Sequence, residues 1–132
     1  MKQNYDVFIS YSHKDSDWVR NVLIKRLEEH QFSVFIDYRD FQGGSLSIEQ
    51  MQSGVTNSRH IVAVMTPNYI QSDWSLFESA MAQSTDPAAV TRKLVPILRE
   101  KCELPLRLSI LHYRDLRSDD EEQWQLLVRD LM

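Results

Sequence analysis

Short runs of strand-forming apolar residues alternate along this chain with stretches of helical spacing, and this alternation constrains the fold more than any other feature. The runs lie at residues 5–10, 32–36, 59–65 and 94–98, with a weaker one at 109–113. The first four are apolar almost throughout, as in strands that are buried on both faces. The pattern predicts a central parallel sheet of four to five strands with helices on both faces. Pro96 predicts that its strand lies at or near an edge of that sheet.

Apolar residues three and four positions apart mark the helical stretches. The predicted apolar faces are Val19, Leu23 and Leu27; Ile48, Met51 and Val55; Phe77, Ala80 and Met81; and Trp124, Leu127, Val128 and Leu131. Ser72 is the predicted cap of a helix at 73–83, and Ser118 with Glu121 forms a predicted capping box. Residues 37–44 are polar and end in two glycines, which predicts a loop.

Composition narrows the class of protein. A chain of 132 residues with 42% apolar residues is long enough for one domain with its own core. The net charge of −4 argues against nucleic acid as the main ligand. The single cysteine, Cys102, excludes an internal disulfide and favours a reducing, cytoplasmic location. No apolar run approaches the length of a membrane span, so we expect no membrane contact.

The last predicted helix reaches Met132 without a glycine or another stop signal. We therefore expect residues 1–132 to be a single domain that forms the N-terminal part of a longer chain or is excised from one.

Ligands of open parallel sheets bind beyond the carboxyl ends of the strands. The candidate segments are therefore 10–14, 37–47 and 66–78. Gly43 and Gly44 form an isolated pair without a phosphate-loop pattern, and we interpret them as a flexible turn. The histidines predict no metal site because no two of them have the spacing of metal ligands. They are His13, His30, His60 and His112.

Trp74 and Glu78 lie four residues apart on a predicted helix, so their side chains meet on one face. Glu78 then lies at the rim of an apolar stripe, where an apolar neighbour strengthens the field of a carboxylate on a nearby cation. The same spacing also fits a surface glutamate beside a tryptophan at the edge of the core.

Five segments taken together resemble the TIR family, the Toll/interleukin-1 receptor/resistance domains. In chain order they read YDVFISYS at 5–12, FSVFID at 32–37, IVAVMTPNY at 61–69, SDWSLFE at 72–78 and LVPI at 94–97. The resemblance implies a flavodoxin-like three-layer α/β sandwich. It also implies one of two functions, because some members are adaptors that signal by TIR–TIR assembly and others cleave NAD+ at the nicotinamide glycosidic bond.

The NAD+-cleaving members carry a glutamate in a W-x-x-x-E pattern, which Trp74 and Glu78 match. The leaving group is a cationic pyridinium that departs as neutral nicotinamide, so the general acid that sugar leaving groups need is not required. Positive charge develops on the ribose carbon, and a carboxylate aimed there stabilises the transition state more than the ground state. The resemblance thus implies that Glu78 is the catalytic carboxylate.

By the same resemblance, Ser10, Tyr11 and Ser12 line the substrate pocket and Trp74 stacks on a ring of the substrate. Without that role, the three would form a solvated strand end and Trp74 would pack at the edge of the core. Leu46 falls where some family enzymes place an aromatic residue that faces the ribose.

The resemblance also implies that the loop at 37–46 covers the site and contacts a neighbouring protomer. Its assembly residues are Asp37, Asp40, Phe41, Gly43 and Gly44. Ser12 and Asp40 stand where some NAD+-cleaving relatives carry basic residues. An inward-pointing Asp40 would repel the substrate pyrophosphate, and we expect Arg39 to compensate.

The resemblance thus implies a prokaryotic-type NAD+ nucleosidase that needs no cofactor besides its substrate. It would release nicotinamide and either ADP-ribose or a cyclic isomer, in antiviral defence. TIR–TIR assembly, driven by an appended sensor domain or a partner protein, would activate it. The alternative is a non-catalytic TIR–TIR scaffold in which Glu78 is incidental. A nucleoside deoxyribosyltransferase-like enzyme, with a related sheet and a catalytic glutamate, is a third possibility.

Overall fold

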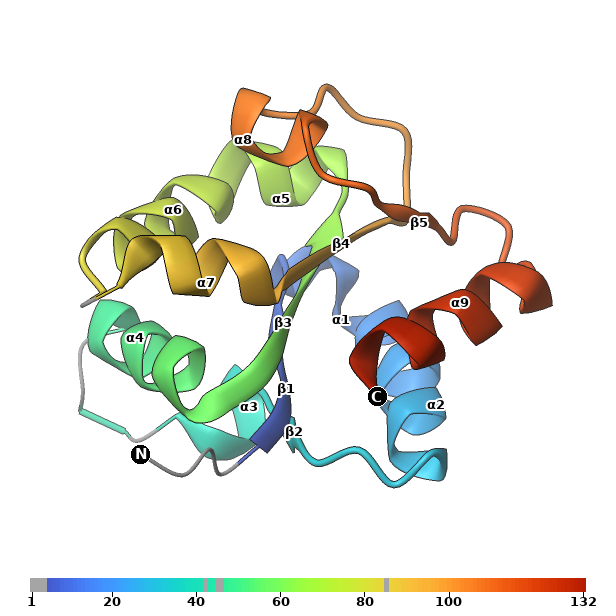
Figure 1. The fold of residues 1–132 in the computed structure, drawn as a ribbon, viewed down its shortest axis with the longest axis horizontal. Coiled ribbons are helices and arrows are strands. Elements are labelled where there is room, and N and C mark those ends of the chain that lie inside the picture. The colour runs from blue at the N-terminus through green and yellow to red at the C-terminus, as the bar shows by residue number, and fades with distance from the viewer. Residues whose placement is uncertain (1–4, 42, 45–46, 85) are drawn as a thin grey trace.

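A five-stranded parallel sheet forms the centre of the computed structural model, which describes residues 5–41, 43–44, 47–84 and 86–132. The strand order is β2-β1-β3-β4-β5, and helices cover both faces (Figure 1). The strands are β1 (Tyr5–Ser10), β2 (Val34–Phe35), β3 (Ser58–Met65), β4 (Leu94–Leu98) and β5 (Arg114–Asp115). The predicted three-layer α/β architecture is therefore confirmed.

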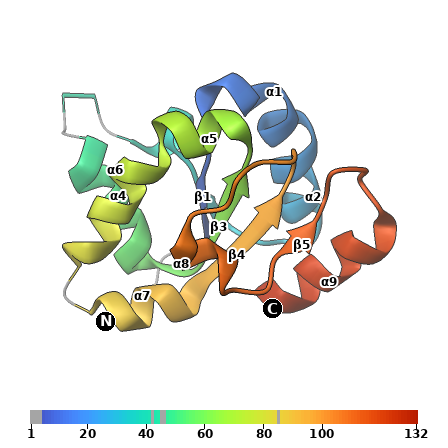
Figure 2. The same ribbon diagram turned by 90° about the horizontal axis from the view of Figure 1, so that it is seen from above.

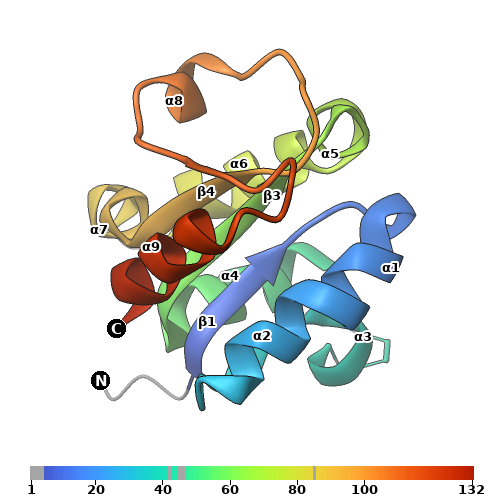
Figure 3. The same ribbon diagram turned by 90° about the vertical axis from the view of Figure 1, so that its right-hand side faces the viewer.

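One face of the sheet is covered by a continuous helical segment after β1 and by the last helix (Figure 3). These elements are η1 (His13–Asp15), α1 (Ser16–Trp18), η2 (Val19–Leu23), α2 (Ile24–Glu29) and α9 (Glu121–Leu131). The other face is covered by the helices that precede and follow β3 (Figure 2). They are α4 (Ser47–Asn57), α5 (Pro67–Ser72), α6 (Trp74–Ala82) and α7 (Pro87–Lys93). Two short helices, α3 (Asp37–Asp40) and α8 (Leu106–Ser109), lie in the connections after β2 and β4.

The core is divided by the sheet into two apolar clusters, because alternate residues of a strand point to opposite faces. Val62 and Val64 of β3 pack with the cluster under α2 and α9, whereas Ile61 and Ala63 pack with the cluster under α4 and α6. The predicted apolar faces are buried at Val19, Leu23 and Leu27 and at Trp124, Leu127 and Leu131, and Val128 packs partly buried against the same cluster. In α4, Gly54 allows a close approach, since a Cβ there would lie 3.0 Å from the rings of Phe8 and Phe35.

The described part of the connection after β3 contains three helices, α5, α6 and α7, where the sequence predicted one helix at 73–83. Helix α5 begins at Pro67, and its N-cap is Thr66, whose hydroxyl accepts a hydrogen bond from the Tyr69 amide at 3.1 Å. The prediction that Ser72 caps a helix is wrong, because Ser72 ends α5 and donates its hydroxyl to the Asn68 carbonyl.

Predictions for the last third of the chain are only partly correct. The strand predicted at 109–113 is wrong: Ser109 ends α8, and the edge strand is β5. The capping box of Ser118 with Glu121 is also wrong, since the N-cap of α9 is Asp120, whose carboxylate accepts from the Glu122 amide at 3.1 Å. Asp119, with a left-handed φ of 54°, turns the chain between Ser118 and this cap.

Pro96 lies next to the edge of the sheet, as predicted. The edge strand β5 pairs with β4 only at Ile97 and Leu98, so the missing amide of Pro96 interrupts no bond to β5. No helix in the described parts of the chain has the length and apolar character needed to cross a membrane.

Candidate functional site

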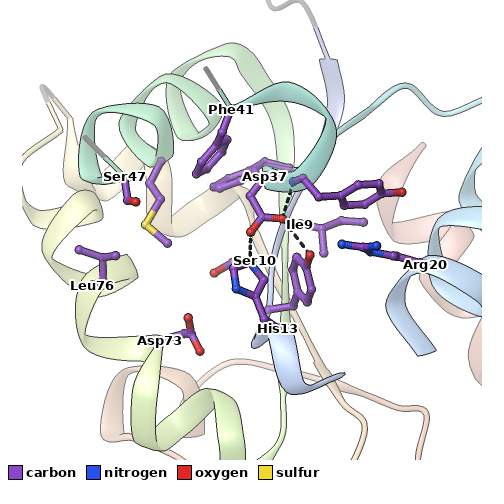
Figure 4. Close-up of a pocket in the computed structure, with 13 residues that line it drawn as sticks. Ile9, Ser10, His13, Arg20, Asp37, Phe41, Ser47, Asp73 and Leu76 are labelled. Carbon is purple, nitrogen blue, oxygen red and sulfur yellow. Dashed lines mark hydrogen bonds and ion pairs between the residues drawn. The ribbon is translucent and has the colours of Figure 1, made fainter. Parts of the chain in front are cut away.

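A cavity of about 470 Å³ lies at the carboxyl end of β1, where the sequence placed the candidate site (Figure 4). β1 and the residue after it supply Ser10 and Tyr11. The connection after β2 supplies Asp37, and α6 with its N-cap supplies Leu76 and Asp73. The structure therefore brings together residues from all three of the segments that follow the strands.

Asp37 is the most highly connected side chain of this cavity (Figure 4). Its carboxylate accepts a hydrogen bond from the Tyr11 hydroxyl at 2.8 Å and one from the Tyr38 amide at 2.7 Å, and it pairs with Nε2 of His13. Burial raises the pKa of Tyr11, and the neighbouring carboxylate raises it further. Tyr11 thus stays a neutral donor that holds Asp37 at the edge of the cavity.

Ser10 lies on the cavity wall, but its hydroxyl is already engaged. It shares a hydrogen bond of 2.8 Å with the hydroxyl of Tyr69, which is fully buried and whose pKa is raised by that burial. Ser12, another predicted pocket residue, is 2% exposed and does not line the cavity. Its hydroxyl accepts from the Lys14 amide at 3.3 Å, as the N-cap of η1.

Arg20, rather than the predicted Arg39, is the guanidinium at the cavity. It lies 3.9 Å above the centre of the Tyr38 ring. Arg39 instead lies in a neighbouring groove, where it pairs with Glu28 at 3.2 Å and donates to the Val34 carbonyl.

Trp74 and Glu78 do not line the cavity. Trp74 is 5% exposed, and its ring centre lies 6.3 Å from that of Tyr69 and 5.9 Å from that of Phe77, so its contacts are those of a core residue. The Glu78 side chain is 43% exposed, and its Oε2 lies 3.6 Å from Nε of Arg107 in α8.

The direction of Glu78 follows from helix geometry. Leu76 of the same helix lines the cavity, and two residues further along an α-helix correspond to a rotation of about 200°. Glu78 therefore points away from the cavity and toward α8.

The residues predicted for the assembly loop have different surroundings. Asp40 accepts a hydrogen bond from the Ile36 amide at 2.8 Å, and the Phe41 ring packs 5.7 Å from that of Phe35. The prediction of a loop from residue 37 is wrong, because Asp37–Asp40 form helix α3. Gly43 and Gly44 are exposed, and Gly44 has a left-handed φ of 85°. Leu46 lies outside the described residues.

The cavity residues that no site prediction named include His13, Arg20, Tyr38, Asp73 and Leu76. The spacing of Asp73 and Leu76, three apart at the start of a helix, was a usable signal. Arg20 had none, because its approach to Tyr38 depends on how α3 folds back against η2. In the described parts of the chain, no group of three or more His, Cys, Asp or Glu side chains is arranged to hold a metal ion.

Comparison with known proteins places this geometry in context. The family model of the TIR domain matches residues 7–128. Toll-like receptor 4 of Felis catus is 34% identical over 128 residues, which cover 94% of this chain and 15% of the receptor. The chain thus spans about 15% of the length of the curated relatives it matches.

Solved structures show the same relationship. The TIR domain of the Toll-related receptor TRR-2 from Hydra magnipapillata is 28% identical, with a TM-score of 0.83 over 97% of this chain and 98% of that one. A metazoan TIR-STING receptor from C. gigas is 25% identical, with a TM-score of 0.75 over 98% of this chain and 40% of that one.

Proposed function

Because this chain belongs to the TIR domain family, we propose that it is a signalling module of innate immunity that acts by assembling with other TIR domains. TIR domains self-associate within larger receptor assemblies, and the receptors named above support that role for this chain. The rest of the protein would supply the signal that starts assembly.

The observation that carries this proposal is the segment after β2, which is anchored at its base and exposed beyond it. Asp37 and Phe41 are held by the contacts described above. Between and after them, Tyr38 is 44% exposed, and Gly43 and Gly44 face solvent. A fixed base with an exposed aromatic ring is a suitable contact surface, since tyrosine is among the residues that contribute most to binding.

Replacement of Tyr38 tests this assignment, and Tyr113 provides a matched control because it is 41% exposed. We expect Tyr38→Ala to raise the concentration at which the domain assembles by about tenfold, corresponding to a loss of about 1.4 kcal/mol per contact. Sedimentation velocity over a dilution series measures this. Tyr113→Ala should assemble like the wild type, and equal behaviour of all three proteins would refute the proposed surface.

Cleavage of NAD+ is a second candidate function. It is supported by the cavity, which offers the guanidinium of Arg20 to the pyrophosphate and the carboxylate of Asp73 to a ribose hydroxyl. For Glu78 to act on a molecule in this cavity, α6 would have to turn and the ion pair with Arg107 would have to break.

Titration of ¹⁵N-labelled protein with NAD+ tests whether the cavity takes this ligand. Binding predicts saturable shifts of the amide signals of Ser10, Asp37 and Leu76, and weaker binding by Asp73→Asn or Arg20→Gln. Signals that stay unchanged at millimolar NAD+ would remove this candidate for the unassembled domain.

A further inference from the structure

A second polar cavity, of about 260 Å³, lies at the opposite end of the sheet from the site described above. Its lining comes from the beginning of β3, β4 and β5 and from Asp130 near the C-terminal end of α9. Arg59 Nη2 donates to the Leu131 carbonyl at 3.0 Å and so holds that end of α9 against β3. We name this cavity the amino-edge pocket; its polar residues are His60, Arg92, His112, Arg114 and Asp130.

The amino-edge pocket has an excess of positive charge. Asp130 is its one carboxylate, and both of its oxygens are occupied by Arg114, with Nε at 2.6 Å and Nη2 at 2.9 Å. This bidentate pair is neutral as a unit and leaves Nη1 of Arg114 without a partner among the described residues. Arg92 forms no ion pair with any described residue, so its charge is unbalanced.

Two imidazoles also line this pocket. Nδ1 of His60 is buried and has no hydrogen-bond partner among the described residues, although buried polar atoms are normally paired. The ring lies among charges from several elements: Arg59 of its own strand, Lys93 of α7, Asp130 of α9 and Asp6 of β1. His112 lines the same pocket from the segment before β5.

We propose that the amino-edge pocket binds a phosphate group or an equivalent oxyanion. Guanidinium groups match the oxygens of phosphate in planar geometry, and charge-assisted hydrogen bonds of this kind are the strong ones. Arg92 and the free Nη1 of Arg114 provide such donors, and the histidines provide others. The site lies on the side of the sheet away from Tyr38 and Gly44, so a ligand can occupy it without covering the surface proposed for assembly.

Protonation of His60 should increase the affinity of the pocket for an oxyanion. Burial, followed by the nearby Arg59, lowers the pKa of His60, so the ring is neutral at pH 7 and becomes a cation only in acid. A bound oxyanion would favour the protonated ring, and by linkage the oxyanion should bind more tightly as the pH falls.

The test is an NMR titration of the ¹⁵N-labelled chain with sodium sulfate at constant ionic strength. Sulfate keeps its double charge between pH 5.5 and 7.5, whereas phosphate itself titrates in that range. We expect saturable shifts centred on His60, Arg92, His112 and Arg114, and an affinity at least threefold higher at pH 5.5 than at pH 7.5, an estimate of about one added charge interaction at the pocket.

Arg92→Gln should weaken sulfate binding at least about fivefold, as the loss of one charge-assisted contact implies. Arg92 is an exposed residue near the end of α7, so this variant keeps the fold. Arg129→Gln is the matched control, because it removes the same charge from an exposed position outside the pocket. Unsaturable shifts spread over all surface cations, or equal losses in the two variants, would overturn the proposal.

The same phosphate chemistry has two sources, which a second experiment separates. Inositol hexakisphosphate is the soluble probe, and vesicles of phosphatidylcholine with phosphatidylinositol phosphate are the lipid probe. Binding to either probe supports the site if Arg92→Gln reduces it and Arg129→Gln does not. The probe that binds identifies the source of the phosphate group. Binding to neither would overturn the proposal.

Discussion

Asp73, the N-cap of α6, and Glu78, in the middle of that helix, are five residues apart, yet their surroundings differ. Asp73 lines the cavity at the carboxyl end of β1, while Glu78 faces α8 and pairs with Arg107. Between them, Trp74 and Phe77 are buried in the core. Trp74 and Glu78 lie four residues apart, so their side chains lie on the same face of α6. That face is turned toward the edge of the core and α8, and the cavity lies on the other side of the helix.

We expect the largest loss of stability on the core face of α6 and a much smaller loss on its cavity face. Trp74→Ala removes a buried indole, and we expect it to lower the free energy of unfolding by about 3–5 kcal/mol. Leu76→Ala, at a residue 37% exposed on the cavity side, should cost less than about 1 kcal/mol. Urea unfolding of both variants measures the difference. Similar losses would contradict the assignment of Trp74 to the core.

One hydrogen bond at the cavity, from Tyr11 to Asp37, is expected to contribute to stability. Tyr11→Phe removes the donor to Asp37, and we expect a loss of about 1 kcal/mol, the usual net value for such a bond. Urea unfolding provides the measurement. Tyr113→Phe, at an exposed tyrosine, is the control and should leave stability unchanged. A Tyr11→Phe variant as stable as the wild type would mean that Asp37 is held by other contacts.

Alkaline pH should reduce the stability of the folded chain through Tyr11 and a second buried tyrosine, Tyr69. The folded chain raises the pKa of Tyr11 and Tyr69 above the ordinary value of 10.0, chiefly through burial. Their contribution to stability is therefore complete below pH 10 and is lost as the pH rises above it, because the unfolded chain releases these protons first. Phenolate absorbance should show a fraction that forms late, from Tyr11 and Tyr69, and a smaller late fraction in Tyr11→Phe. A late fraction that is the same size in both proteins would contradict the burial of Tyr11.

The smallest effect concerns the ion pair of Glu78. Both side chains are more than 40% exposed, and the nitrogen and oxygen are 3.6 Å apart. Arg107→Gln should therefore change the free energy of unfolding by less than about 0.5 kcal/mol. A loss above about 2 kcal/mol in urea unfolding would indicate a buried, structural pair and would change the comparison with Asp73.

Much of the architecture could be predicted from the sequence because the buried positions of strands and helices are occupied by apolar residues at regular spacing. The runs at 5–10 and 94–98 coincide with β1 and β4, and the stripe at Val19, Leu23 and Leu27 is fully buried. The family was also predicted correctly from segments distributed over the chain. Local signals failed where a competing contact decides the outcome, as at Asp120, which caps α9 in place of Ser118.

The site was less predictable, since a residue's direction depends on packing between distant elements. Ser10 and Tyr11 follow a strand, and the rule for open sheets placed them at the cavity. No local pattern shows that Glu78 turns toward α8 or that Arg20 reaches Tyr38. The roles predicted for Glu78 and Trp74 remain predictions. Variants at these two residues test them.

The most direct test of the account is nicotinamide release from NAD+ by the assembled domain, with Glu78→Gln beside the wild type. The protein is concentrated until sedimentation shows assembly, and the products are separated by chromatography. We expect the wild type to assemble and to release no more nicotinamide than Glu78→Gln. Release by the wild type that disappears in Glu78→Gln would contradict this expectation and would establish Glu78 as the catalytic carboxylate.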